Sequence, residues 1–318
     1  MIEAIAQYIA KDLDQVDAHI DSILESDTAL VREVGQYVRT NGGKRLRPML
    51  AILSSRAFGY TGNDHTKVAA SLELVHTATL LHDDVIDKAP LRRGKPTVNA
   101  KWGDDVAILI ADYLYSNAFN LAMQSLSPQV LAIICQVTAK MCEGELFQIE
   151  KRNDLLTRED YLRIVRKKTA YLFSACTALG SVLGKANEIE TAQMSNYGLN
   201  FGIAFQITDD TLDLVGSDSV VGKEHWTDIR NGKQTLPLIH AFTSAEPADR
   251  EDLINCWNNG RDTERIMGHI KKYRGIEYAL GEARSFATTA KEQLASLKPS
   301  RAVEMFHQLS DYVIQRSS

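Results

Sequence analysis

The spacing of apolar residues along the chain predicts long amphipathic helices. In the first segment they stand three or four positions apart, at Ile2, Ile5, Ile9, Leu13, Val16, Ile20 and Ile23. This spacing places them on one stripe of a helix with about 3.6 residues per turn. Further helical patterns cover residues 29–38, 67–85, 106–125, 128–151, 157–183, 189–215 and 301–315, and another begins at Pro48. Residues 87–96 and 216–232 are polar and are predicted as loops.

The whole chain fits an all-α protein. No segment shows the alternation of apolar and polar residues that marks a half-buried strand. Only 7 of the 318 residues are proline, and none stands between Pro128 and Pro237, as suits long helices. No linker rich in Pro, Gly or Ser divides the sequence. We therefore expect a single all-α domain over residues 1–318.

Composition and charge exclude several classes of protein. The net charge of −5 provides no basic field for nucleic acid. The four cysteines lack CxxC spacing, so we expect buried thiols in a reducing compartment rather than disulfides or a zinc site. The first residues do not resemble a signal peptide, and the apolar runs are shorter than the ~18 residues of a membrane span. We expect a soluble, cytoplasmic protein.

Two acidic clusters share the spacing DDxxD and carry the clearest chemical signal. They comprise Asp83, Asp84 and Asp87, and Asp209, Asp210 and Asp213. The first and last Asp of each cluster are four residues apart, so on a helix they lie one turn apart and repel each other. Both clusters directly follow apolar stretches, which places them at the ends of buried helices. Six carboxylates require cations, and oxygen ligands favour Mg²⁺, with Mn²⁺ as an alternative.

The doubled motif also indicates what the metal would hold. Mg²⁺ usually takes one or two carboxylates and completes its octahedron with water and substrate phosphates. Two DDxxD motifs therefore predict a diphosphate bound through several Mg²⁺ ions. One such cluster alone would fit a solvated helix end better than a metal site. A Ca²⁺ site is disfavoured, because neither cluster has the Asp-x-Asp-x-Asp-Gly pattern.

Basic residues near predicted turns could bind further phosphate. They are Lys44, Arg45 and Arg47 after Gly42-Gly43, Arg92-Arg93 after the first cluster, Lys168 beside Thr169, and Lys223 and Lys233 after the second cluster. Guanidinium groups and helix N-termini are good phosphate ligands. Any one of these residues could be merely solvated. Their joint pattern predicts a second anionic substrate.

These motifs, taken in order, resemble those of the trans-isoprenyl diphosphate synthases, and most closely the long-chain bacterial polyprenyl type. The matching segments are residues 42–48, 73–87, 91–96, 168–169, 205–213 and 232–237. The resemblance implies an all-α isoprenoid-synthase bundle of long helices around a central cavity, and usually a homodimer. It also implies head-to-tail addition of isopentenyl diphosphate to an allylic diphosphate, with farnesyl diphosphate as the expected primer.

The resemblance implies a role for each motif residue. The six Asp residues would bind two to three Mg²⁺ ions on the allylic diphosphate. That diphosphate would also contact Arg92, Lys168, Thr169 and Gln206, with Lys233 and Lys223 neutralising the leaving group. Isopentenyl diphosphate would be held by Lys44, Arg47, His76 and Arg93. Without the resemblance, His76 fits a core histidine better.

The sequence departs from the family pattern after the second cluster. Trp226 stands where relatives usually have Gly, and Thr227 where they have an acid, while Asp228 is kept. This departure leaves the closure of the loop and the role of Lys223 open.

Small residues before the first cluster bear on product length. In the family these positions line the tunnel for the growing chain, and here they are Ala78 and Thr79. We therefore expect a product of about C40, of the kind used as a quinone side chain, with Phe119 a candidate for the tunnel floor. Such a product is insoluble in water, which predicts transient membrane contact at release. The alternatives are a C20–C25 synthase, a class I terpene cyclase, a non-catalytic subunit and a purely structural helical protein.

Overall fold

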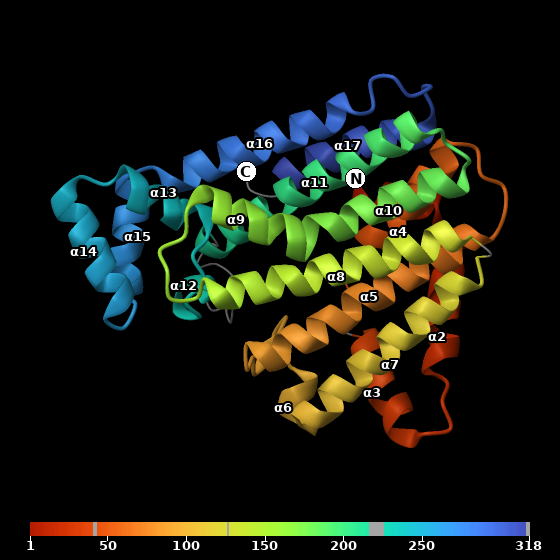
Figure 1. Cartoon of the computed structure of the whole chain (residues 1–318), viewed down its shortest axis with the longest axis horizontal. Coiled ribbons are helices and arrows are strands. Elements are labelled where there is room, and N and C mark those ends of the chain that lie inside the picture. Colours follow the sequence, from red (N-terminus) through yellow and green to blue (C-terminus); the bar gives the residue numbers. More distant parts are fainter. Residues whose placement is uncertain (41–42, 126, 216–225, 316–318) are drawn as a thin grey trace. The chain divides into compact units, whose positions relative to one another are not determined.

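The computed structural model describes residues 1–40, 43–125, 127–215 and 226–315, and these are almost entirely helical (Figure 1). The elements are α1 (Ile2–Tyr8), α2 (Ala10–Leu24), α3 (Ala29–Thr40), α4 (Leu46–Ala57), α5 (Asp64–Ile86), β1 (Leu91–Arg92), β2 (Lys95–Pro96), α6 (Val98–Trp102), α7 (Asp104–Met123), α8 (Pro128–Glu150), α9 (Arg158–Val165), the π-helical turn η1 (Arg166–Ala170), α10 (Tyr171–Leu183), α11 (Glu188–Val215), α12 (Thr227–Arg230), α13 (Leu236–Ser244), α14 (Pro247–Asn258), α15 (Thr263–Lys272), α16 (Gly275–Glu292) and α17 (Arg301–Gln315). The all-α prediction is confirmed.

The chain forms two compact units, each assembled from separate segments. Unit 1 comprises Met1–Thr138, Leu172–Ser195 and Ser296–Phe306. Unit 2 comprises Ala139–Tyr171, Asn196–Ala295 and His307–Ser318. The expectation of one domain over residues 1–318 stays a prediction.

Helix α5 is the centre of unit 1. It packs against α2, α4 and α7, and Figure 1 shows α5 and α7 side by side. Apolar residues on several faces of α5 are buried, including Val68, Leu72 and Val75. Burial on several faces is what the near-continuous apolar sequence of this helix predicts. The first acidic cluster therefore stands at the end of a helix that is buried over much of its length.

Helix α7 combines packing with an exposed apolar face. It is the helix in the described part of the chain that is long and apolar enough to cross a membrane, and less than half of that stretch is buried. Core helices of soluble proteins meet the same criteria, so this is weak evidence for a membrane span. On its outer side Ile108, Leu109 and Met123 are exposed.

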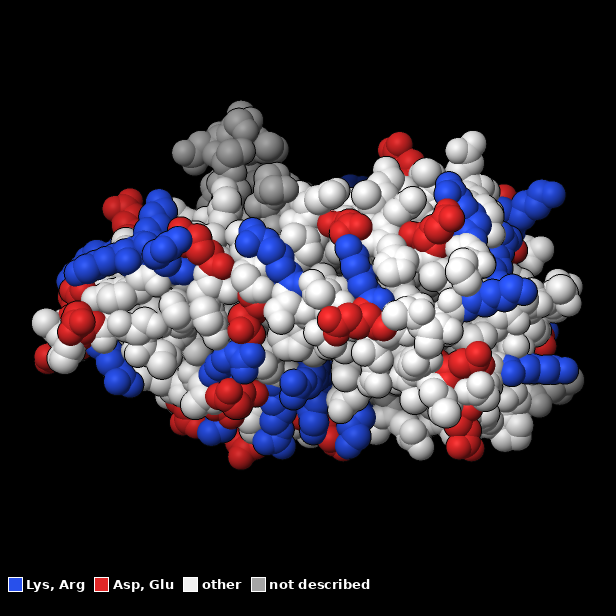
Figure 2. Space-filling view, turned by 90° about the horizontal axis from the view of Figure 1, so that it is seen from above, with Lys and Arg blue, Asp and Glu red and all other residues white. Residues whose placement is uncertain are grey.

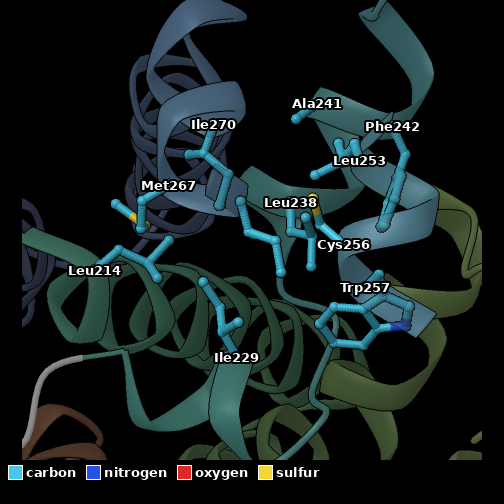
Figure 3. Close-up of a cluster of buried hydrophobic side chains, with 11 residues drawn as sticks. Leu214, Ile229, Leu238, Ala241, Phe242, Leu253, Cys256, Trp257, Met267 and Ile270 are labelled. Carbon is cyan, nitrogen blue, oxygen red and sulfur yellow. The ribbon is translucent and has the colours of Figure 1, made fainter. Parts of the chain in front are cut away.

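Unit 2 contains an apolar cluster that anchors the end of α11 (Figure 3). Leu214, next to Asp213, packs there with Ile229 of α12. The other buried members are Leu238, Ala241, Phe242, Leu253, Cys256, Trp257, Ile266, Met267 and Ile270. Through this cluster α13, α14 and α15 pack at the end of α11 and so support the second acidic motif.

Several local expectations need correction. The first helix is broken at Ile9 into α1 and α2, and α4 begins at Leu46 rather than Pro48. Proline fits the third helical position because N–H groups of the first turn have no acceptor within the helix.

Cys135 and Cys142 are exposed on α8, so the expectation of buried thiols holds only for Cys176 and Cys256. On the face shown in Figure 2, basic and acidic side chains are interspersed.

Candidate active site

The first acidic cluster lies at the C-terminal end of α5. Asp83 is half-buried on the last turn, and Asp87 caps the helix with its N–H bonded to the Asp83 carbonyl at 2.8 Å. The C-terminus of a helix carries partial negative charge, so carboxylates there are disfavoured unless a cation compensates them. The second cluster lies at the corresponding end of α11, which ends at Val215. Each unit therefore carries one acidic helix terminus that favours cation binding.

Asp84 differs from its two neighbours. It is 4% exposed, and its Oδ1 accepts a hydrogen bond of 2.8 Å from Nε of Arg92. Removal of the charged partner of a buried carboxylate is strongly destabilising, because it leaves an uncompensated buried charge. Asp84 therefore orients Arg92 in this structure.

Arg92 and Arg93 lie on a short hairpin within the predicted 87–96 loop. Strands β1 and β2 pair antiparallel, with Arg93 (φ 54°) and Gly94 (φ 74°) at the turn. Positive φ at both central residues matches a type I′ turn, which glycine accommodates without strain. The Tyr37 hydroxyl donates to the Pro96 carbonyl at 2.6 Å and ties the hairpin to α3. The strands are too short to be predicted from sequence alternation.

Four arginines lie near enough to His76 in unit 1 to act on its charge state. Burial, and then the charges of Arg47, Arg92, Arg93 and Arg45, hold the pKa of His76 well below its usual range. His76 is therefore neutral near pH 7 and can act toward a phosphate only as a hydrogen-bonding group. The structure thus brings His76 together with three arginines that the sequence assigned to substrate.

Two further contacts fix this basic cluster. The Arg47 guanidinium lies over the ring of buried Phe173, 4.5 Å from its centroid. A β-carbon placed on Gly43 would lie 2.9 Å from Nη2 of Arg93, so the hairpin meets the turn before α4. Lys44 is exposed on that turn. Gly42 lies outside the described residues.

Substitution of His76 tests its role as a neutral donor. We expect His76→Gln to keep the KM for isopentenyl diphosphate, the substrate that the motif resemblance implies, within about threefold, because the amide also donates without charge. We expect His76→Ala to raise that KM about 10- to 100-fold through loss of a hydrogen bond to a charged group. Steady-state kinetics, with thermal unfolding as the stability control, would check both. Equal damage by Gln and Ala would contradict this role.

In unit 2, Asp210 is held through both of its carboxylate oxygens. The Tyr161 hydroxyl donates to Oδ2 at 2.6 Å, and Gln206 Nε2 donates to Oδ1 at 2.7 Å. Thr169 Oγ1 in turn donates to Gln206 Oε1 at 2.9 Å. Three of the predicted residues, Thr169, Gln206 and Asp210, are thereby linked in one network.

The protonation of Asp210 and Tyr161 reflects their burial. Burial, and then the charge of Asp228, raises the pKa of Asp210 to about 7. Hydrogen bonds from Tyr161 and Gln206 oppose this rise. Burial and the Asp210 charge raise the pKa of Tyr161 well above its usual range, so its hydroxyl stays a donor. A cation beside Asp210 would relieve the repulsion and favour the carboxylate form.

Lys168 and Thr169 stand on the π-helical turn η1, which interrupts the predicted helix 157–183. Such turns occur frequently at functional sites, because they redirect side chains within a helix. The turn packs closely on α8, where a β-carbon on Gly144 would lie 2.6 Å from Cβ of Lys167. Thr157 is the N-cap of α9 and forms a complete capping box with Asp160.

Lys168 is positioned by two side chains of α8. It forms an ion pair with Glu145 and donates to Gln148 Oε1 at 3.2 Å. The Glu145 side chain is 13% exposed, so it provides a largely desolvated partner for the ammonium group. The neighbouring Lys167 instead pairs with Glu143, at 2.6 Å.

Trp226, one of the two departures from the family pattern, stands in a backbone conformation that favours glycine. Trp226 has φ of 62°, a region that favours glycine, and its N–H bonds the Asp213 carbonyl at 3.2 Å. The N–H of Asp228 donates to Asp213 Oδ2 at 3.0 Å, and the N–H of Lys233 to the Asp228 carbonyl at 2.8 Å. Backbone contacts thus connect Asp213 with Lys233. Lys223 lies outside the described residues.

The acidic clusters suit Mg²⁺ held jointly with a ligand. Among the described residues no three His, Cys, Asp or Glu side chains converge as a preformed metal site. A closed protein cage is not what Mg²⁺ needs, since phosphate and water usually supply most of its ligands. Carboxylates at a negative helix end, taken in each unit by itself, fit a metal whose other ligands are phosphate and water. Asp83 and Asp87 in unit 1, and Asp209, Asp210 and Asp213 in unit 2, are the side chains placed to provide it.

The predicted chain-length residues lie on α5, in the part that packs on α7. Ala78 is fully buried, and half-buried Thr79 donates its hydroxyl to the His76 carbonyl at 2.7 Å. On α7, the rings of Tyr115 and Phe119 stack with centroids 6.1 Å apart. The role of Phe119 as a tunnel floor stays a prediction.

Several positioning residues were missed in the sequence. Tyr161, Glu145 and Phe173 each contact a predicted site residue, yet each stands in an ordinary helical pattern. Glu145 gave only a weak signal, because it is one of three acids on the largely apolar helix α8. Tyr161 and Phe173 gave no signal, since aromatic residues in apolar patterns are usually core.

Comparison with known proteins places the chain in a family. The family model described as polyprenyl synthetase matches residues 28–274. The chain is 35% identical to octaprenyl diphosphate synthase of Escherichia coli over 99% of both chains. It is also 35% identical to a short chain isoprenyl diphosphate synthase of Methanothermobacter thermautotrophicus over 98% of both chains. A polyprenyl synthase of Caulobacter crescentus, solved with calcium and isoprenyl diphosphate, superposes with a TM-score of 0.94 at 32% identity, covering 100% of this chain and 98% of that one.

The chain belongs to the polyprenyl synthetase family and is a prenyltransferase. Its fold is the all-α isoprenoid-synthase fold, as the motifs predicted. The similar proteins differ in their named product class, so membership of the family leaves product length open.

Proposed function

We propose that this prenyltransferase condenses isopentenyl diphosphate with an allylic diphosphate, farnesyl diphosphate being the primer, to give an all-trans polyprenyl diphosphate. The observation that carries the proposal is that Arg47 and Arg93, two cations of unit 1, lie near enough to His76 to lower its pKa. These cations suit an anionic second substrate, as condensation requires. A terpene cyclase has a single diphosphate substrate and would not need them.

The proposed reaction has three chemical stages. The allylic C–O bond breaks to give an allylic cation and diphosphate, the cation alkylates the double bond of isopentenyl diphosphate, and a proton is then lost. Released diphosphate is the expected base. Lys168, Arg92 and Lys233 would stabilise the negative charge that develops on the leaving group. Mg²⁺, or Mn²⁺ in its place, would supply further charge neutralisation when bound to the Asp clusters.

Binding roles follow from the contacts in each unit. In unit 1 we assign Lys44, Arg47, His76 and Arg93 to isopentenyl diphosphate, and Asp83 and Asp87 to metal. Asp84 serves mainly to orient Arg92 toward the allylic diphosphate. In unit 2 we assign the allylic diphosphate to Lys168, Thr169 and Gln206 and to metal on Asp209, Asp210 and Asp213, with Lys223 and Lys233 beside the leaving group.

Activity of the purified single chain tests the proposal. Release of diphosphate should require isopentenyl diphosphate, an allylic diphosphate and Mg²⁺, and chelation of the metal should abolish it. Activity only after addition of a second protein would instead favour the non-catalytic subunit. Diphosphate release without isopentenyl diphosphate would favour a cyclase.

The product is proposed to be about C40. The support is that Ala78 and Thr79, which the family resemblance places on the tunnel wall, are both small. We expect Ala78→Phe to shorten the product to C20–C25 while leaving the chemistry in place. Mass spectrometry of the products would check this, with Ala70→Phe, another fully buried alanine on α5, as the packing control. An unchanged product from a folded Ala78→Phe would remove Ala78 from the tunnel wall.

We also propose that the chain forms a homodimer through α7. Leu109 and Met123 expose 67% and 61% of their surface, and Ile108 exposes 41%. Exposed apolar side chains on a packed helix favour burial against a second copy. Light scattering on the purified protein should give the mass of two chains, and the mass of one chain would refute the dimer.

A further inference from the structure

Arg45 has an unusual conformation at the start of α4. It is the N-cap of the helix and has φ of 54°, in the left-handed region. Glycine adopts this left-handed conformation with less strain than arginine. Such strained residues persist only where surrounding contacts hold them, and they cluster at functional sites.

The Arg45 guanidinium makes two ion pairs that hold this conformation. Nη1 donates to Glu73 Oε1 of α5 at 2.8 Å, and Nη2 lies 3.3 Å from Asp17 Oδ1 of α2. The side chains of Arg45 and Glu73 are only 16% and 6% exposed. The Glu73 carboxylate therefore depends on Arg45 as its charged partner.

These ion pairs connect the two parts of the isopentenyl diphosphate site. Lys44 precedes Arg45 on the turn and Arg47 follows it in the first turn of α4, while Glu73 stands one helical turn before His76 on α5. The Arg45–Glu73 pair therefore fixes Lys44 and Arg47 relative to the helix that carries His76.

We propose that Arg45 is a positioning residue for isopentenyl diphosphate, acting through its ion pairs with Glu73 and Asp17. It does not contact the substrate but sets where Lys44 and Arg47 present their charges. The inference rests on the proposed function, in which those two residues bind this diphosphate. Misplacement of binding groups by about 1 Å is enough to cost about 10²-fold in such sites.

The kinetic signature of this role is selective. We expect Arg45→Ala to raise the KM for isopentenyl diphosphate about 10- to 100-fold, with the KM for the allylic diphosphate changed less than about threefold. Glu73→Gln should also raise the KM for isopentenyl diphosphate. Arg45→Lys should recover part of the loss, because lysine keeps the charge but lacks the fork that reaches two carboxylates. Calorimetric titration with isopentenyl diphosphate alone measures the Kd, and we expect the Kd values to rank these variants in the same order.

Arg39→Ala is the matched control. Arg39 shares Asp17 with Arg45, at 3.1 Å, and also pairs with Asp21 at 2.7 Å, but it lies on α3 and not on the turn. Loss of its ion pairs should leave the KM for both substrates within about twofold. If Arg39→Ala raises the KM for isopentenyl diphosphate as much as Arg45→Ala does, the effect is general to the ion-pair network and the inference is overturned.

Two reference variants separate this inference from the proposed function. Lys44→Ala and Arg47→Ala should each raise the KM for isopentenyl diphosphate, and if neither does, the assignment of the site fails. If both do and folded Arg45→Lys and Glu73→Gln leave that KM unchanged, only the role of Arg45 is refuted. An equal rise in the KM for both substrates would also refute it. Circular dichroism and thermal unfolding identify variants that do not fold, and the two conservative variants keep the test available in that case.

Discussion

We expect Asp83→Asn to lower kcat about 10²- to 10³-fold, the size of loss seen when one preorganised group that stabilises transition-state charge is removed. Asp83 lies on the last turn of α5, where the helix terminus already carries negative charge. The amide keeps the size of the side chain but removes the charge that attracts Mg²⁺. Loss of the metal weakens neutralisation of the leaving diphosphate, so the chemical step slows.

Steady-state turnover over a series of Mg²⁺ concentrations measures this effect. The half-saturating Mg²⁺ concentration should rise together with the fall in kcat. Asp104→Asn is the control, because Asp104 is an exposed acid in the same unit, at the start of α7. A normal kcat at ordinary Mg²⁺ concentration for Asp83→Asn would show that the first cluster does not bind the catalytic metal.

Replacement of Lys168 should have an effect of similar size. We expect Lys168→Met to lower kcat about 10²-fold or more, because a preorganised ammonium group next to the leaving diphosphate is lost. Its contacts with Glu145 and Gln148 hold the ammonium group in place, so a neutral side chain of similar length cannot substitute. Single-turnover measurements would place the loss in the ionisation step rather than in product release.

Lys167→Met is the matched control for Lys168. The two lysines are neighbours on η1, but Lys167 pairs with exposed Glu143, an interaction worth little to stability. We expect the turnover of Lys167→Met to stay within about threefold of that of the unchanged enzyme. Equal losses in the two variants would mean that the turn as a whole matters and that Lys168 has no special role.

The fold was largely predictable because its signal is repeated many times. Apolar residues recur every three or four positions over long stretches, so helices such as α8, α11 and α17 were predicted to within a residue or two. The failures are local. A broken helix at Ile9, the π turn at Arg166–Ala170 and the two-residue strands of the hairpin each depend on packing of neighbouring elements. No periodic pattern of the sequence encodes them.

The candidate site divides in the same way. Charged residues with a fixed spacing, such as Asp83 and Asp87, are visible in the sequence and so were found. Residues that act by holding them, such as Tyr161 on Asp210 and Phe173 under Arg47, depend on contacts between distant segments. Asp84 differs from Asp83 and Asp87 because it is buried and paired with Arg92. The spacing of the motif alone could not show this difference.

The most direct test of the central claim is the mass of the product made by the purified chain from farnesyl diphosphate, isopentenyl diphosphate and Mg²⁺. We predict a dominant polyprenyl diphosphate of about C40, absent when the metal is chelated. A dominant C20 or C25 product would keep the condensation chemistry and contradict the proposed chain length. The absence of any elongated product, with other allylic primers also tried, would contradict the proposed activity of the single chain.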